Sequence, residues 1–248
     1  KALSGAVLTR LIQQHVKRLK VCERAHKRRR ILKRREHVEV LAKNALWVQD
    51  SAQVARDFDG GKVESQLIKD RGSLVTVGIT TGGPTRGTDV ISLLEALRCT
   101  RGLPFVLGSD NGSPFVCEDV EVYLRLHEVI HLRSLPHTPE HNGSAESCVR
   151  ESKCCAQMGS HVIASSAQAH VFMLRAAILM NKNRIRASKG FKTAGELDEK
   201  MIASYQRVQR TLFYGECSKR IEHVRRSGFE YRAMRMAERN AIFGTMEH

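Results

Sequence analysis

Residues 104–112 read Pro-Phe-Val-Leu-Gly-Ser-Asp-Asn-Gly, and residues 139–146 read Pro-Glu-His-Asn-Gly-Ser-Ala-Glu. The first stretch is an apolar run that stops at Asp110, where the Asn-Gly pair predicts a tight turn, so it is expected to be a buried strand. The second is a loop rich in Pro, Asn and Gly that leads into a helix with Glu146 in its first turn. A strand end and a helix start are thus predicted to direct two carboxylates at one place.

The hydrophobic periodicity around this stretch predicts an ordered series of strands and helices. Strands are expected over residues 45–54, 63–68, 74–79 and 129–132, with a hairpin turn at residues 70–73. Helices are expected over residues 88–101 and 118–127, in a pattern continuing from Glu146 through Leu179, and in the tail from Leu197 onward. This order predicts an α/β fold in which a mixed β-sheet is flanked by helices.

The net charge of +15 on 248 residues is unevenly distributed. Residues 1–45 carry fourteen basic and three acidic side chains, residues 46–155 carry eleven and fifteen, and residues 156–248 carry sixteen and eight. An acidic centre between two basic arms suits a protein that binds a polyanion at its flanks and keeps its central carboxylates for cations. Nucleic acid is the expected partner, and a solvated basic surface on an ordinary soluble protein is the alternative.

The N-terminal arm has a helical apolar pattern over residues 4–20, followed by the densest positive run of the chain. This run is predicted to contact DNA phosphates, and a solvated interdomain linker is the alternative. The expected organisation is a basic helical arm or linker over residues 1–45, which could be the end of a helix-turn-helix unit, a core over 46–186, and a basic helical region over 187–248. The predicted DNA-binding residues of the arm are Arg28, Arg29, Arg30, Lys33, Arg34 and Arg35.

The seven cysteines form no Cys-x-x-Cys pair, so reduced thiols in a cytoplasmic protein are expected. No signal peptide or membrane contact is expected, because no apolar run approaches the roughly 18 residues that span a bilayer. The pairs His127 with His131 and His137 with His141 have metal-like spacing. A zinc site is not expected there, because no cysteine pair completes it.

Three carboxylates at predicted strand or helix positions form the candidate site: Asp50, Asp110 and Glu146. Thirty-five residues separate the last two. Magnesium prefers hard oxygen ligands and keeps several waters, so two or three carboxylates plus a substrate phosphate make a plausible site. The alternatives are that Asp57 or Asp70 supplies the first ligand, that Asp110 only shapes a turn, and that Glu146 only favours the helix dipole.

The segments 47–50, 109–112 and 139–146 resemble the catalytic core of insertion-sequence transposases and retroviral integrases. The thirty-five-residue gap before the glutamate is the spacing for which that superfamily is named. Lys153, seven residues after Glu146, matches a basic position that commonly touches DNA in the family. The ending of bacterial members is similar to Asn181, Arg184 and residues 190–194, although Ala194 stands where proline is usual and Ser51 where threonine is common.

This resemblance, which covers about residues 45–195, implies a ribonuclease H-like fold and magnesium-dependent nicking and joining of DNA. It implies that Asp50, Asp110 and Glu146 are catalytic and hold two Mg²⁺ or Mn²⁺ ions. The implied partners are element-end and target DNA and further copies of the chain in a synaptic complex, associated with the nucleoid of a prokaryote. The alternatives are a catalytically decayed DNA-binding protein and a simple nuclease on the same fold. The expected DNA contacts in the core are Asn142, Arg150 and Lys153.

Overall fold

The computed structural model describes residues 40–135, 143–158, 163–201 and 207–246, which belong to one compact unit. The predicted N-terminal helix and the basic run that follows it lie outside these residues. The domain boundaries after residues 45 and 186 therefore stay predictions.

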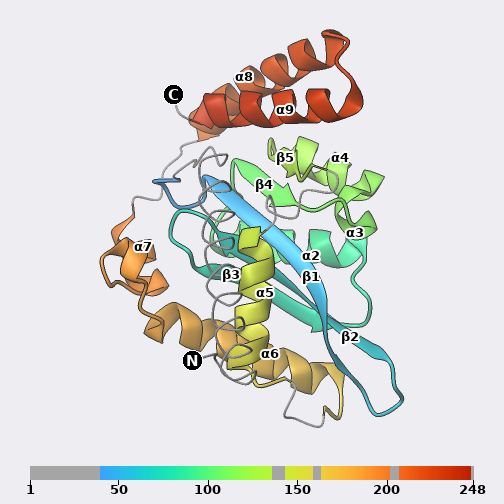
Figure 1. The fold of residues 1–248 in the computed structure, drawn as a ribbon, viewed down its shortest axis with the longest axis vertical. Helices are drawn as coiled ribbons and strands as arrows, with labels where there is room; N and C mark the ends of the chain where they lie inside the picture. The colour runs from blue at the N-terminus through green and yellow to red at the C-terminus, as the bar shows by residue number, and fades with distance from the viewer. Residues whose placement is uncertain (1–39, 136–142, 159–162, 202–206, 247–248) are drawn as a thin grey trace, which may run out of the picture. The chain divides into compact units, whose positions relative to one another are not determined.

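Five strands form one mixed sheet in the order β3-β2-β1-β4-β5 (Figure 1). The first three strands of the chain are antiparallel neighbours, whereas β4 and β5 run parallel to β1. The hairpin turn predicted at residues 70–73 connects β2 to β3, and every predicted strand is present with slightly different ends. The strands are β1 (Leu46–Arg56), β2 (Lys62–Asp70), β3 (Thr76–Gly82), β4 (Val106–Ser109) and β5 (Ile130–Arg133).

Helices flank the sheet, as the sequence predicts. The helical pattern expected from Glu146 through Leu179 is two helices, because the first ends at Cys155 and the second begins after Ser165, whose side chain accepts a hydrogen bond from N of Gln168. The short helix α3 was not predicted. The helices are α2 (Gly87–Thr100), α3 (Ser113–Val116), α4 (Glu118–Leu126), α5 (Gly143–Cys155), α6 (Ser166–Asn183), the 3₁₀ turn η2 (Ala187–Lys189), α7 (Ala194–Lys200), α8 (Arg207–Arg226) and α9 (Tyr231–Met246).

Alternate residues of β1 point into cores on opposite faces of the sheet. Trp47 is fully buried and packs with Leu94 of α2 and Leu124 of α4. Val54 lies in the other core, with Val149 of α5 and further apolar side chains of α6. Since both faces of β1 are covered, its sequence is apolar at most positions, and a polar side chain within it needs a specific partner.

Helices α8 and α9 form an antiparallel pair that covers β4 and β5 (Figure 1). Phe105, just before β4, stacks on Phe213 of α8 with ring centroids 4.9 Å apart. Arg210 donates to the carbonyl of Pro104 at 2.7 Å and lies over the Phe105 ring. The basic tail is thus attached to the sheet by an apolar seam. None of the described helices combines the length and apolar character needed to cross a membrane.

Candidate active site

The pairing of two parallel strands brings Asp50 and Asp110 together. Leu46 of β1 lies opposite Val106 of β4, and Val48 lies opposite Gly108. Two further residues along the same register place Asp50 beside Asp110, which directly follows the last residue of β4. Neighbouring strands lie about 4.8 Å apart, so two carboxylates at equivalent positions come close to each other on the same face.

Helix α5 carries Glu146 to the same end of the sheet. The helix packs on β1 and β2, and Nζ of Lys153 donates to the carbonyl of Gln53 at 2.8 Å. Glu146 precedes Lys153 by seven residues, about 10.5 Å of helix, and Asp50 precedes Gln53 by three, about 10 Å of strand. The Lys153 contact therefore sets Glu146 alongside Asp50.

The pKa of Asp50 is affected by its burial and by the charges of the other two acids. Its side chain is largely buried, with 9% of the residue exposed, and its carboxylate accepts a hydrogen bond from N of Ser51 at 2.9 Å. Burial raises the pKa of Asp50 to about 7; the negative charges of Asp110 and Glu146 also raise it, and the Ser51 hydrogen bond opposes them. Three carboxylates from three different elements thus act on one another at this end of the sheet.

The two other candidates for the first acid, Asp57 and Asp70, accept hydrogen bonds from backbone N–H groups instead. Asp70 is fully buried, accepts hydrogen bonds from the backbone N of Asn44 and Gly72 at 2.7 and 2.8 Å, and pairs with Arg101. Asp57 accepts from N of Gly61 within the β1–β2 turn. Among the three aspartates considered for this position, Asp50 lies where the charges of Asp110 and Glu146 raise its pKa.

A buried polar network behind Asp110, which the sequence did not predict, fixes its position. The Ser109 hydroxyl lies 2.8 Å from the carbonyl oxygen of Asp110 and 2.8 Å from Nε2 of His131 on β5. The other ring nitrogen, Nδ1, lies 2.6 Å from Oε1 of Glu121, which also pairs with Arg133. Burial alone would raise the pKa of Glu121, but His131 and Arg133 together lower it to about 2. The ionised carboxylate therefore accepts a hydrogen bond from Nδ1–H of His131.

The turn after β4 completes the support of Asp110. Its Oδ1 accepts a hydrogen bond from N of Gly112 at 2.9 Å, and the Asn111 amide donates to the carbonyl of Ser134 at the end of β5. The predicted Asn-Gly turn is confirmed. In the sequence, His131 stands between the apolar residues Ile130 and Leu132, which are both buried. This alternation places the histidine side chain on the opposite face of β5, which is also covered.

The predicted DNA-contacting residues differ in their surroundings. Arg150 is exposed on α5, one turn after Glu146. Lys153 is engaged by the Gln53 carbonyl. Asn142 and the basic run of the arm lie outside the described residues.

A divalent cation fits the chemistry of the acid site. The donors are carboxylate oxygens, which Mg²⁺ and Mn²⁺ prefer. Burial and then the charges of Asp110 and Glu146 raise the pKa of Asp50, and a bound cation would offset both by favouring the ionised carboxylate. Within the described ranges, no three His, Cys, Asp or Glu side chains are already arranged as a metal cluster. Of the four histidines with metal-like spacing, His137 and His141 lie outside the described residues. His131 contacts Ser109 and Glu121, and the His127 ring lies 4.5 Å from that of Tyr123.

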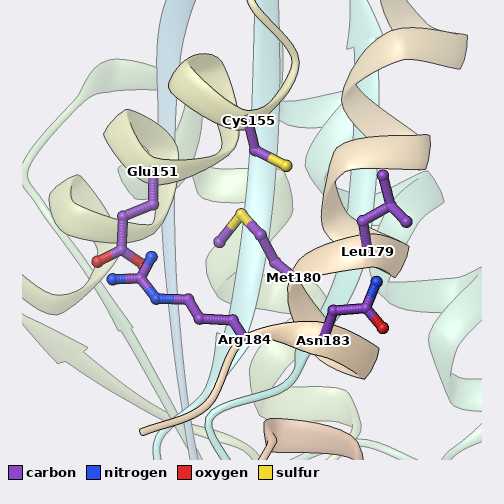
Figure 2. A pocket seen from close by; sticks show the side chains of 6 residues that line it. All are labelled: Glu151, Cys155, Leu179, Met180, Asn183 and Arg184. Carbon is purple, nitrogen blue, oxygen red and sulfur yellow. The ribbon is translucent and has the colours of Figure 1, made fainter.

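Residues at the end of α6, which resemble the ending of bacterial members of the family, join α6 to β3 and to α5. Asn181 exchanges two hydrogen bonds of 3.0 Å with the backbone of Thr76 at the start of β3. Arg184 pairs with Glu151 of α5 at 2.6 Å. Figure 2 shows this ion pair on the wall of a cavity of about 330 Å³, which is otherwise lined by Cys155, Leu179, Met180 and Asn183.

The fold is similar to retroviral integrase catalytic cores, which confirms the predicted ribonuclease H-like class. A chain of the simian T-cell lymphotropic virus intasome, solved in complex with PP2A regulatory subunit B56 gamma, has a TM-score of 0.58 and 16% identity; the match covers 69% of this chain and 60% of that chain. The HTLV-2 integrase catalytic core domain in complex with magnesium, in its trimeric form, has a TM-score of 0.52 and 14% identity, over 64% of this chain and 98% of that one.

No protein-family model matches this sequence, and a comparison with curated proteins finds no match either. The chain spans about three fifths of the length of the intasome chain that it matches. The class of the fold therefore comes from structure, in agreement with the resemblance of the short segments around the three acids.

Proposed function

We propose that this chain is a DDE-type polynucleotidyl transferase that cleaves a DNA strand and joins the resulting 3′ hydroxyl to a second DNA. The observation that carries the proposal is the parallel register of β1 with β4, which brings Asp50 near Asp110 at the end of the sheet where α5 carries Glu146. The likeness of the fold to integrase cores supports it.

In this proposal the three carboxylates hold two Mg²⁺ or Mn²⁺ ions. The bound ions would supply an activated water or hydroxyl and stabilise the leaving oxygen of an in-line displacement. Each acid has its own structural support: Asp50 lies on the central strand, Asp110 is held by its turn and the Ser109–His131 contact, and Glu146 lies on α5, where Lys153 bonds to the Gln53 carbonyl. Because no three His, Cys, Asp or Glu side chains of the described residues are arranged as a metal cluster, the acids would draw closer together when the ions bind.

The proposed partners are element-end and target DNA and further copies of the chain. The HTLV-2 neighbour is described in complex with magnesium and in trimeric and dimeric forms, and the simian virus neighbour is an intasome. Here Arg150, Asn142 and the basic arm would contact phosphates, which position DNA without reading its sequence. Lys153 would join them only by exchanging the Gln53 carbonyl for a phosphate.

The test is incorporation of a fluorescent duplex with randomised 3′ ends into supercoiled plasmid, in Mg²⁺ or Mn²⁺. Asp110→Asn is expected to lower cleavage and joining by about a thousandfold, because one of the three carboxylates that would hold the ions changes from an anion to an amide. The matched control is Asp59→Asn in the exposed β1–β2 turn, which should react like the unmodified chain.

Each alternative has its own outcome. Joining that persists in Asp110→Asn would refute the DDE mechanism. Cut plasmid without joined product would indicate a simple nuclease. Tight DNA binding with no reaction in the unmodified chain, and the same binding in the Asp50→Asn, Asp110→Asn, Glu146→Gln triple variant, would indicate a decayed DNA-binding protein.

A further inference from the structure

The segment 182–192, which begins in the last turn of helix α6, is a basic turn well separated along the chain from the three acids. It contains five basic residues and no acidic residue. Arg186 pairs with Lys192 in an isolated antiparallel bridge, and the η2 turn lies between them. The basic residues are Lys182, Arg184, Arg186, Lys189 and Lys192.

Phe191 stands at the tip of this turn in a conformation that disfavours its own side chain. Its φ is +59°, directly after Gly190 at +67°, and its backbone N donates to the carbonyl of Arg186 at 3.1 Å. A bulky residue in this left-handed region is strained by about 1 kcal/mol or more, and glycine would relieve the strain. The turn therefore retains an aromatic ring at a position where the backbone alone favours glycine.

The ring gains little packing in return. Phe191 is 74% exposed, and Ile185 on the same segment is 62% exposed. A strained, exposed aromatic side chain stabilises the fold less than a glycine would, and its ring is accessible to another molecule.

The charges around Phe191 favour a polyanion as that molecule. Glu151 pairs with Arg184, while Nε of Arg186 is buried and has no hydrogen-bond partner within the described part of the chain. Burial lowers the pKa of Arg186, the charge of Arg184 lowers it further, and Glu151 opposes them. One carboxylate thus serves two arginines, and Lys182 and Lys192 add positive charge at the two ends of the segment.

We propose that the turn at residues 182–192 binds single-stranded nucleic acid, with a base stacked on Phe191 and the flanking phosphates held by Lys182 and Lys192. Stacking on an aromatic ring within a basic track is how proteins bind single strands without sequence preference. This is a second contact, separate from the acid site. The Glu151–Arg184 pair, seen in Figure 2, links the turn to α5, the helix that carries Glu146.

The test measures binding of a fluorescent fifteen-nucleotide oligothymidylate by anisotropy, with the full chain in EDTA. Phe191→Gly is expected to weaken binding by about tenfold, because one base loses its stacking partner. Because glycine suits the backbone, its unfolding temperature should not fall. Phe191→Tyr, which keeps the ring, should bind within about twofold of the unmodified chain, and Lys192→Ala should lower the slope of log Kd against log salt by about 0.7.

The β1–β2 turn offers a matched control. Phe58 is 71% exposed and lies between Asp57 and Asp59, so it is an equally accessible ring with the opposite charge around it. Phe58→Gly should leave oligonucleotide binding unchanged.

Three results would overturn the inference. One is full binding by Phe191→Gly, and another is an equal loss in Phe58→Gly. The third is a Phe191→Gly defect on phosphatidylserine vesicles but not on the oligonucleotide, which would identify a membrane contact instead. Since EDTA removes the metal, Asp110→Asn should bind the oligonucleotide normally, so a failure here is distinct from a failure of the proposed reaction.

Discussion

Asp50 and Asp70 are buried aspartates on neighbouring strands, and they differ in what surrounds them. Asp70, opposite Trp47, is met by backbone N–H groups and the guanidinium of Arg101. Asp50, three residues farther along β1, accepts from Ser51 and faces the charges of two other acids. The buried carboxylate of Asp70 is thus surrounded by hydrogen-bond donors, whereas the buried carboxylate of Asp50 has other carboxylates near it.

The largest expected effect on stability belongs to Asp70. Asp70→Ala should lower the free energy of unfolding by about 3–5 kcal/mol, because it leaves buried N–H donors without an acceptor and removes a charge that faces Arg101. Urea unfolding measures this, with Asp59→Ala as the exposed control, expected to change by less than about 0.5 kcal/mol. A loss no larger than the control's would mean that Asp70 is not the structural acid.

Stabilisation of the folded chain by Mg²⁺ is expected to depend on Asp50. At pH 8, Mg²⁺ at a hundredfold its dissociation constant should stabilise the chain by about 2.7 kcal/mol, because it binds the folded acid site. Thermal unfolding with and without Mg²⁺, at constant ionic strength, measures the shift. Asp50→Asn should abolish most of it, while Asp59→Asn should not. Equal shifts in all three proteins would place the cation elsewhere.

The pH dependence of stability in EDTA should reveal Asp50 directly. The pKa of Asp50 is about 7 in the folded chain against 3.8 for the ordinary group, so between pH 4 and 7 the folded state keeps a proton that the unfolded state has lost. The free energy of unfolding should therefore fall as pH rises through this window, by on the order of 2 kcal/mol after allowance for screening, and level above it. Asp50→Asn should remove this slope; an unchanged slope in the variant would contradict the assignment.

The smallest effect is expected from the support of Asp110. His131→Phe keeps a buried ring but loses the contacts with Ser109 and Glu121, so it should cost about 1–2 kcal/mol of stability. Chemical unfolding of His131→Phe, Glu121→Gln and the double variant measures the coupling between the two side chains. Strictly additive losses would show that the 2.6 Å contact contributes nothing.

Much of the fold follows from local patterns in the sequence. The apolar run before Asp110, the strand containing Asp50 and the helix start at Glu146 were all predicted, because periodicity and turn residues act over a few positions. The helical pattern predicted from Glu146 through Leu179 is present as two helices, because helical periodicity alone does not show where one helix ends and the next begins. The docking of α8 on Phe105 was out of reach, because it joins residues more than a hundred positions apart.

By itself, the sequence determined which residue types stand at strand ends and helix starts, and hence that two or three carboxylates could meet. It favoured Asp50 over Asp57 and Asp70, which fit turns better, but only on a tryptophan and a strand pattern. The tertiary structure adds the strand pairing: the parallel register of β1 with β4 brings Asp50 near Asp110, while the antiparallel register with β2 leaves Asp70 beside Trp47. Which acids meet is a property of the register, and the register is set by contacts between segments that are distant in the chain.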